Sequence, residues 1–191
     1  MGRRTLDIVL TAGGVLMTVV FLVAGSLLMW GATFTKGTVH DQLAAQQIFM
    51  PAEGNAQLAN PEIGPYLNQY VGQQLVNGDQ AEAYADHFIA VHLQKVANGQ
   101  TYAQVSTKAQ ANPTDATLKG QAATLFQGES LRGVLLTAYA FWTAGQIAMW
   151  ASIGAFVAAG LMLVLVILGT MHTRRVSTVI EVVGPPQAIA S

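Results

Sequence analysis

Hydrophobic residues concentrate in two long segments of this chain, one near each end. The first runs from Ile8 to Trp30 and the second from Gly133 to Met171, and neither contains a charged residue. About 20 apolar residues suffice for an α-helix to cross a bilayer, so each segment predicts a transmembrane helix. The first also exceeds the roughly 7–15 apolar residues of a cleaved signal peptide, so we predict that it is retained.

The second apolar segment is nearly twice as long as one crossing requires and contains no polar turn. We therefore predict one long helix over residues 133–171. Its first half is expected to project from the membrane or to lie at its outer surface, and the crossing itself to cover about Ile147–Met171. Polar and aromatic residues of that first half support this division: Thr137, Tyr139, Trp142, Thr143 and Gln146.

Arginine pairs flank the two segments on their outer sides, Arg3 and Arg4 before the first and Arg174 and Arg175 after the second. Because basic residues at membrane ends are retained in the cytoplasm, both termini are predicted to be cytoplasmic. Tryptophan is enriched at membrane interfaces, so the outer interface is predicted near these residues: Trp30, Trp142 and Trp150.

Helix signals dominate the polar region between the two apolar segments. Short helices are expected over Asp41–Ile48 and Pro65–Val76, with an irregular loop over Ala52–Gly64. The Asn77-Gly78 and Asn98-Gly99 pairs are typical of helix C-termini.

Two capping-box patterns mark helix starts in the same region. Asp79 with Glu82 predicts a helix over Gln80–Ala97, and Thr101 with Gln104 predicts one that stops before Pro113. A last helix is expected from about Thr114, with a face that carries Leu118, Ala122, Leu125 and Phe126. It can continue into the second apolar segment with a bend around Gly128 or Gly133.

The fold class predicted is an all-α membrane protein of five or six helices. Its expected parts are a cytoplasmic N-terminus with the first span (1–34), an extracytoplasmic helical domain (35–132), a long helix that includes the second span (133–171) and a cytoplasmic tail (172–191). We expect the plasma membrane as its location.

Composition narrows the function classes. Charged residues make up 10% of the chain, against about 25% in soluble domains, as expected for a membrane protein. The net charge of −1 and the lack of a basic stripe argue against nucleic acid as a partner. The absence of cysteine excludes disulfides and thiolate chemistry.

Histidines beside carboxylates are the weak metal-site candidates: His40, His87 and His92. His87 and His92 are five residues apart, whereas ligands on one helix favour spacings of three or four. We therefore predict no metal site, no bound cofactor and no catalytic residue, and expect that the chain is not an enzyme.

Two other patterns suggest contacts. Glu129 and Arg132, three residues apart, are expected to anchor the chain at the interface or to contact a partner subunit or lipid headgroup. Small residues that recur every four positions favour close helix packing, either between the two spans or against another subunit. The first span has one such row, Gly14 and Thr18. The second segment has two: Ala144, Ala148 and Ser152 form one, and Ala151, Ala155 and Ala159 form the other.

Nearly the whole chain except the tail resembles a family of small actinobacterial two-span membrane proteins of unknown function. The resemblance is carried by residues 39–46, 72–76, 80–93 and 124–133, which include the segments VHDQLAAQ and TLFQGESLRG. It implies an actinobacterial plasma membrane and supplies no catalytic residues. Some family members carry the label of an aromatic ring-opening dioxygenase, which requires an iron site.

The functional expectation is a non-catalytic accessory or structural subunit of a plasma-membrane assembly, for which a respiratory complex is one candidate, or a homo-oligomeric scaffold. The partners would be membrane lipids and other subunits or further copies of the chain. An alternative is a module that binds a lipid or small hydrophobic ligand, suggested by Tyr139, Phe141 and Trp142 and requiring a concave apolar pocket. A metal-dependent enzyme that uses the three histidines is the third hypothesis.

Overall fold

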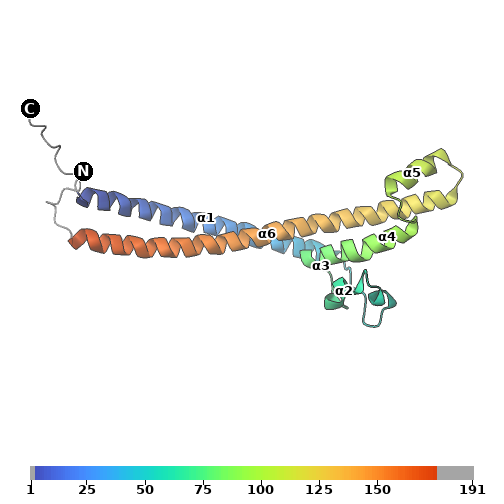
Figure 1. Cartoon of the computed structure of the whole chain (residues 1–191), viewed down its shortest axis with the longest axis horizontal. Helices are drawn as coiled ribbons and strands as arrows, with labels where there is room; N and C mark the ends of the chain where they lie inside the picture. The colour runs from blue at the N-terminus through green and yellow to red at the C-terminus, as the bar shows by residue number, and fades with distance from the viewer. Residues whose placement is uncertain (1–2, 176–191) are drawn as a thin grey trace, which may run out of the picture. The chain divides into compact units, whose positions relative to one another are not determined.

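The computed structural model describes residues 3–175, and every regular element in that range is helical (Figure 1). An isolated β-bridge joins Phe49 and Gln74. The prediction of an all-helical chain is confirmed for this range, whereas the predicted tail lies largely outside it. The elements are α1 (Arg3–Ala45), η1 (Ala56–Ala59), α2 (Gly64–Leu67), η2 (Asn68–Tyr70), α3 (Gly78–Ala83), the π-helical η3 (Tyr84–Ile89), α4 (Ala90–Val96), α5 (Tyr102–Ala111) and α6 (Ala116–Arg175).

The chain divides into two compact units. Among the described residues, one combines 3–31 with 148–175, and we call it the helical hairpin; the other, residues 32–147, we call the helical domain. Both α1 and α6 contribute to both units, because each helix continues without interruption past the unit boundary. These two helices are long and apolar enough to cross a membrane, as the sequence predicts.

Small residues form the contact between the two antiparallel helices of the hairpin. The Ser152 hydroxyl is fully buried and donates a hydrogen bond of 2.8 Å to the Gly25 carbonyl oxygen. A Cβ added at Gly14 would lie 2.8 Å from the Val166 side chain. The backbones therefore approach each other more closely than larger residues would allow.

The contact repeats every seven residues. On α1 the buried positions Thr18 and Gly25 are seven apart, and on α6 so are Ser152 and Ala159. A seven-residue spacing drifts only about 20° around a helix, so such positions stay on one face. The interface of the hairpin is therefore built like a coiled-coil seam with small side chains.

Gly14 and Thr18, the predicted row of the first span, both lie at the contact. The two predicted rows with a spacing of four in the second segment reach the seam only at their last residue. Each step of four residues turns about 40° around a helix, so a long row changes face. Along one row, Ala151 is exposed, Ala155 is half-buried and Ala159 is buried. In the other row, Ala144 is exposed, Ala148 is half-buried and Ser152 is buried.

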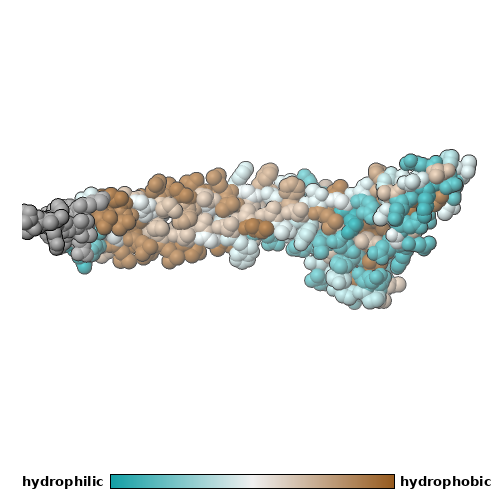
Figure 2. Space-filling model, turned by 45° about the horizontal axis from the view of Figure 1, so that its top comes forward, coloured by the Kyte–Doolittle hydropathy of each residue, from teal (hydrophilic) through white to brown (hydrophobic). Residues whose placement is uncertain are grey.

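Large apolar side chains cover the outside of the hairpin. Leu10, Leu16 and Leu161 each expose about two thirds of their surface, at 65%, 64% and 65%. Figure 2 shows this as the brown surface over the two-helix segment. Small and hydroxyl-bearing residues thus lie inside and bulky apolar ones outside, the reverse of a soluble helix pair.

The helical domain has a conventional apolar core. Leu67, Leu75 and Leu135 are completely buried. Side chains from α1, α3, η3, α4, α5 and α6 join them, together with Met50 and Ile63 from the segment between α1 and α2. The core members are Val39, Leu43, Met50, Ile63, Leu67, Leu75, Ala81, Ala83, Ala85, Ile89, Val91, Leu93, Ala97, Val105, Leu125 and Leu135.

Trp142 of α6 connects three elements of the domain. Its ring packs against Gly78 at the start of α3, where an added Cβ would lie 2.3 Å from the Trp142 Cβ. The Lys36 ammonium of α1 lies 4.6 Å from the ring centroid, and the indole N–H donates to Asp79 at 3.3 Å. Trp142 is therefore a packing residue of the domain, and the interfacial role predicted for it stays a prediction.

Several predicted helix boundaries need correction. The segment Asp41–Ile48 is not a separate helix, because α1 runs on to Ala45 and ends where Gln47 adopts a positive φ of 53°. The helix expected over Pro65–Val76 ends already at Tyr70. The loop expected over Ala52–Gly64 contains the short η1.

The start of α3 also differs from the prediction. Asn77 opens this helix instead of closing the previous one: its backbone is extended and its side chain accepts from the Gln80 N–H at 2.9 Å. The predicted Asp79 and Glu82 box is thus replaced by a cap two residues earlier.

Other helix ends agree with the sequence. Thr101 and Gln104 form the predicted capping box of α5, which ends before Pro113. Gly99 has a φ of 79° just after α4, as expected at a helix C-terminus. The last helix begins at Ala116, with Asp115 accepting from two N–H groups, and it continues as one helix through Gly128 and Gly133 into the second apolar segment.

Replacing Gly78 by alanine should destabilise the helical domain by about 2 kcal/mol, because the new methyl group collides with Trp142 and the helices must move apart. The matched control is Gly120→Ala on α6, where an added Cβ meets nothing within 4 Å. It should stabilise by about 0.5–1 kcal/mol. Pulse proteolysis with trypsin in urea measures both; equal stability of the two variants would contradict the packing.

The hairpin predicts a specific disulfide in a chain that has no cysteine of its own. A Cβ added at Gly169 would lie 3.9 Å from the Cβ of Thr11, a Cβ–Cβ distance within the range of disulfides. The double variant Thr11→Cys with Gly169→Cys should therefore form a bond on mild oxidation, seen as a mobility shift on non-reducing gels. Thr11→Cys with Gly160→Cys is the control and should remain reduced, since Gly160 has no neighbour within 4 Å; bonding in the control alone would refute the register.

Candidate functional site: a charged clamp and the adjacent groove

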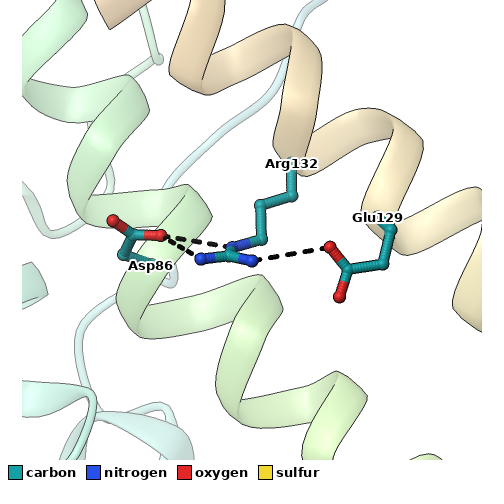
Figure 3. A network of polar contacts seen from close by, with 3 residues as sticks. All are labelled: Asp86, Glu129 and Arg132. Atoms are coloured by element: carbon teal, nitrogen blue, oxygen red, sulfur yellow. Dashed lines mark hydrogen bonds and ion pairs between the residues drawn. The ribbon is translucent and has the colours of Figure 1, made fainter. Parts of the chain in front are cut away.

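A charged clamp joins η3 to α6 in the helical domain (Figure 3). Arg132 donates from Nη2 and Nε to Asp86 Oδ1, at 2.7 and 3.2 Å. It also approaches Glu129, one turn earlier on α6, at 3.5 Å. Glu129 and Arg132 thus contact each other, but the stronger partner of Arg132 is Asp86, 46 residues away in the sequence.

The π-helical segment η3 distributes its side chains over several neighbours. Asp86 reaches α6, while the ring of His87 stacks on Tyr66 with a centroid distance of 3.3 Å. Within η3 itself, the ring of Phe88 stacks on that of Tyr84 at 4.7 Å. Because π-helical turns are rare and often mark functional positions, this segment is the least ordinary backbone of the domain.

The electrostatics of the clamp favour a structural role, in which Arg132 fixes α6 against η3. The hydrogen bond from Asp86 is the main cause that raises the pKa of Arg132 above its usual value, while partial burial acts in the opposite direction. The side chains of Arg132 and Asp86 are both about one third exposed, at 31% and 33%. A permanently charged arginine that is fully engaged with carboxylates positions helices and offers no proton for catalysis.

The phenols of this region are also poor proton acceptors. Burial raises the pKa of Tyr84. Burial, followed by the charges of Asp79 and Glu82, raises the pKa of Tyr70. Both side chains are therefore more firmly protonated at neutral pH than a free tyrosine, which is opposite to the shift that activates a tyrosine as a base.

The three histidines predicted as weak metal candidates are not brought together into a ligand set. His40 pairs with its neighbour Asp41 at 3.2 Å, and His92 Nδ1 contacts the Phe88 carbonyl oxygen. His87 lies in the ring stack with Tyr66. Within residues 3–175, no group of three or more His, Asp or Glu side chains could hold a metal ion.

A groove of about 530 Å³ lies between α1 and α6 of the helical domain. Val39 and Leu43 are buried, whereas Val134 and Phe141 expose 54% and 58% of their surfaces. Glu129 belongs both to the groove and to the clamp. The residues that line it are Val39, Gln42, Leu43, Gln46, Glu129, Ser130, Gly133, Val134, Thr137, Ala138 and Phe141.

The remaining predicted contact residues lie as follows. Trp30 and Trp150 expose 66% and 67% of their surfaces. Of the aromatic residues predicted to line a ligand pocket, only Phe141 lines the groove. Sequence reasoning missed the small seam residue Gly25; its signal would have been the seven-residue spacing from Thr18.

No protein-family model, curated protein or solved structure matches this chain. The resemblance to the actinobacterial family therefore stays a prediction.

Asp86 and Glu129, the two carboxylates of the clamp, should contribute unequally to the stability of the helical domain. Asp86→Asn removes the charged acceptor of two hydrogen bonds, at 2.7 and 3.2 Å, and should destabilise the domain by about 1 kcal/mol, a modest value because the pair is partly exposed. Glu129→Gln, the matched control, weakens only a 3.5 Å contact and should change stability by less than about 0.5 kcal/mol. Urea titration of both variants and of Arg132→Met tests this order, and a larger loss for Glu129→Gln would contradict it.

Proposed function

We propose that this chain is a two-span membrane protein that acts as a non-catalytic accessory or structural subunit of a plasma-membrane assembly. The observation that carries the proposal is the inverted packing of the hairpin. Thr18, Gly25 and Ser152 lie in the contact between its helices, while leucines expose about two thirds of their surfaces. In water such a pair would expose its apolar side chains and gain little from association.

A lipid environment explains this arrangement. Lipid tails are as apolar as leucine, so burying leucine between two helices brings no advantage in a bilayer. Helices there associate through close van der Waals packing and hydrogen bonds, which small residues and serine provide. The Ser152 hydrogen bond to Gly25 is the kind of contact that this reasoning requires.

The proposed orientation follows from charge. The arginine pairs at both ends of the apolar segments, Arg3 with Arg4 and Arg174 with Arg175, favour cytoplasmic termini. Residues 35–132 would then lie outside the cytoplasm. The exposed rings of Trp30 and Trp150 support an outer interface near these positions.

An accessory role is supported by a second small-residue surface on the hairpin. Ala151 is exposed, and a Cβ at Gly154, which lies three residues further on the same face of α6, would meet nothing within 4 Å. Another transmembrane helix could approach α6 closely at these positions. We propose that this surface contacts a subunit of a larger complex, such as a respiratory one, or another copy of the chain.

Mild-detergent purification from native membranes, followed by mass spectrometry and native-gel sizing, tests this role. We expect stoichiometric partner subunits or a discrete homo-oligomer. Gly154→Leu should reduce the recovered partner at least threefold, because leucine blocks close approach. Gly13→Leu on α1, also open on its surface, is the control and should retain the partner. A stable monomer with no associated protein at native abundance would refute the accessory role.

A further inference from the structure

We propose that the groove between α1 and α6 of the helical domain is a binding site for an uncharged amphiphile: a lipid with one apolar chain in the groove and a hydroxyl-bearing head. The proposal does not depend on the accessory role argued above. It rests on the lining of the groove, its charge and its size.

Both buried and exposed apolar side chains line the groove. Val39 and Leu43 of α1 are 7% and 2% exposed and form part of the domain core. On α6, Val134 and Phe141 line the same groove and remain more than half exposed. Large exposed apolar side chains beside a concave surface are typical of binding sites, and an alkyl chain would cover them.

Uncharged polar groups border this apolar surface. Gln42 of α1 and Gln46, in the turn just after it, offer amide donors and acceptors, and Ser130 of α6 offers a hydroxyl. Thr137 donates its hydroxyl proton to the Gly133 carbonyl oxygen, which leaves the lone pairs of its oxygen as acceptors for a ligand hydroxyl. These groups match a head that both donates and accepts hydrogen bonds.

The charge of the site argues for a neutral head. Glu129 is the charged residue of the groove lining, and Arg132 lies 3.5 Å from its carboxylate. Arg132 itself is held by Asp86 at 2.7 Å, so its guanidinium is directed into the clamp. An anionic head would meet Glu129 without a free cation among the lining residues, and a cationic head would compete with Arg132.

The size of the groove favours a small molecule over a protein partner. Its volume of about 530 Å³ falls within the range of roughly 300–1,000 Å³ that is usual for ligand pockets. It is lined by 11 residues, whereas a stable interface between proteins uses about 20–30 residues on each side.

Photo-crosslinking of the full-length protein in nanodiscs tests this site. The probe is a C16 monoacylglycerol with a diazirine in its acyl chain, compared with the phosphate ester and the trimethylammonium analogue of the same chain. We expect the neutral probe to label peptides that contain residues 39–46 and 133–141, at least threefold more strongly than either charged analogue.

Two variants on α6 make the test specific. Gly133→Leu places a side chain into the groove from a position whose Cβ meets nothing within 4 Å, and should reduce labelling at least tenfold. Gly120→Leu is equally open but lies outside the groove lining, and should label like the original chain. Thr137→Leu provides a second groove-filling change with the same expected loss. Trypsin resistance shows which variants are folded.

Several results would overturn the proposal. The site would be refuted if Gly133→Leu and Thr137→Leu fold and are still labelled as strongly as the original chain. Labelling spread evenly over the exposed helices would refute it as well. A preference for the phosphate or the ammonium probe would refute the neutral head. Conversion of a dimer to a monomer by Gly133→Leu would assign the groove to a second copy of the chain.

Discussion

Close approach of two helix backbones is the constraint on which the hairpin depends. The Ser152 hydroxyl reaches the Gly25 carbonyl oxygen at 2.8 Å, which is possible only because glycine and serine leave room there. Once small residues occupy the contact, the leucines and valines of both helices must face outwards. The same choice of residues therefore determines the packing of the pair and the apolar character of its surface.

The helical domain uses a different principle, with an apolar core that is held by a few specific long-range contacts. Trp142 packs on Gly78 and lies beneath the Lys36 ammonium, while Arg132 binds Asp86 across 46 positions of sequence. Each contact connects α6 to a different part of the chain. The groove lies beside the clamp because Glu129 takes part in both.

Structural features that depend only on neighbouring residues in the sequence could be predicted. The long apolar runs indicate α1 and α6, and Thr101 with Gln104 identifies the start of α5. Contacts between residues that are far apart in the sequence could not be predicted. No local pattern shows that Asp86 meets Arg132, or that Gly78 leaves space for Trp142. The seam was recognised only in part, because rows of four were considered where the contact repeats every seven residues.

The most direct test of the account is the accessibility of single cysteines in intact cells, since the chain contains none of its own. A membrane-impermeant maleimide should label Gly120→Cys of the helical domain from outside. Leu161→Cys, at an exposed position of the hairpin, should stay unlabelled even after the cells are opened, because lipid surrounds it. Rapid labelling of Leu161→Cys, or labelling of Gly120→Cys only after lysis, would contradict a membrane hairpin that carries an external domain.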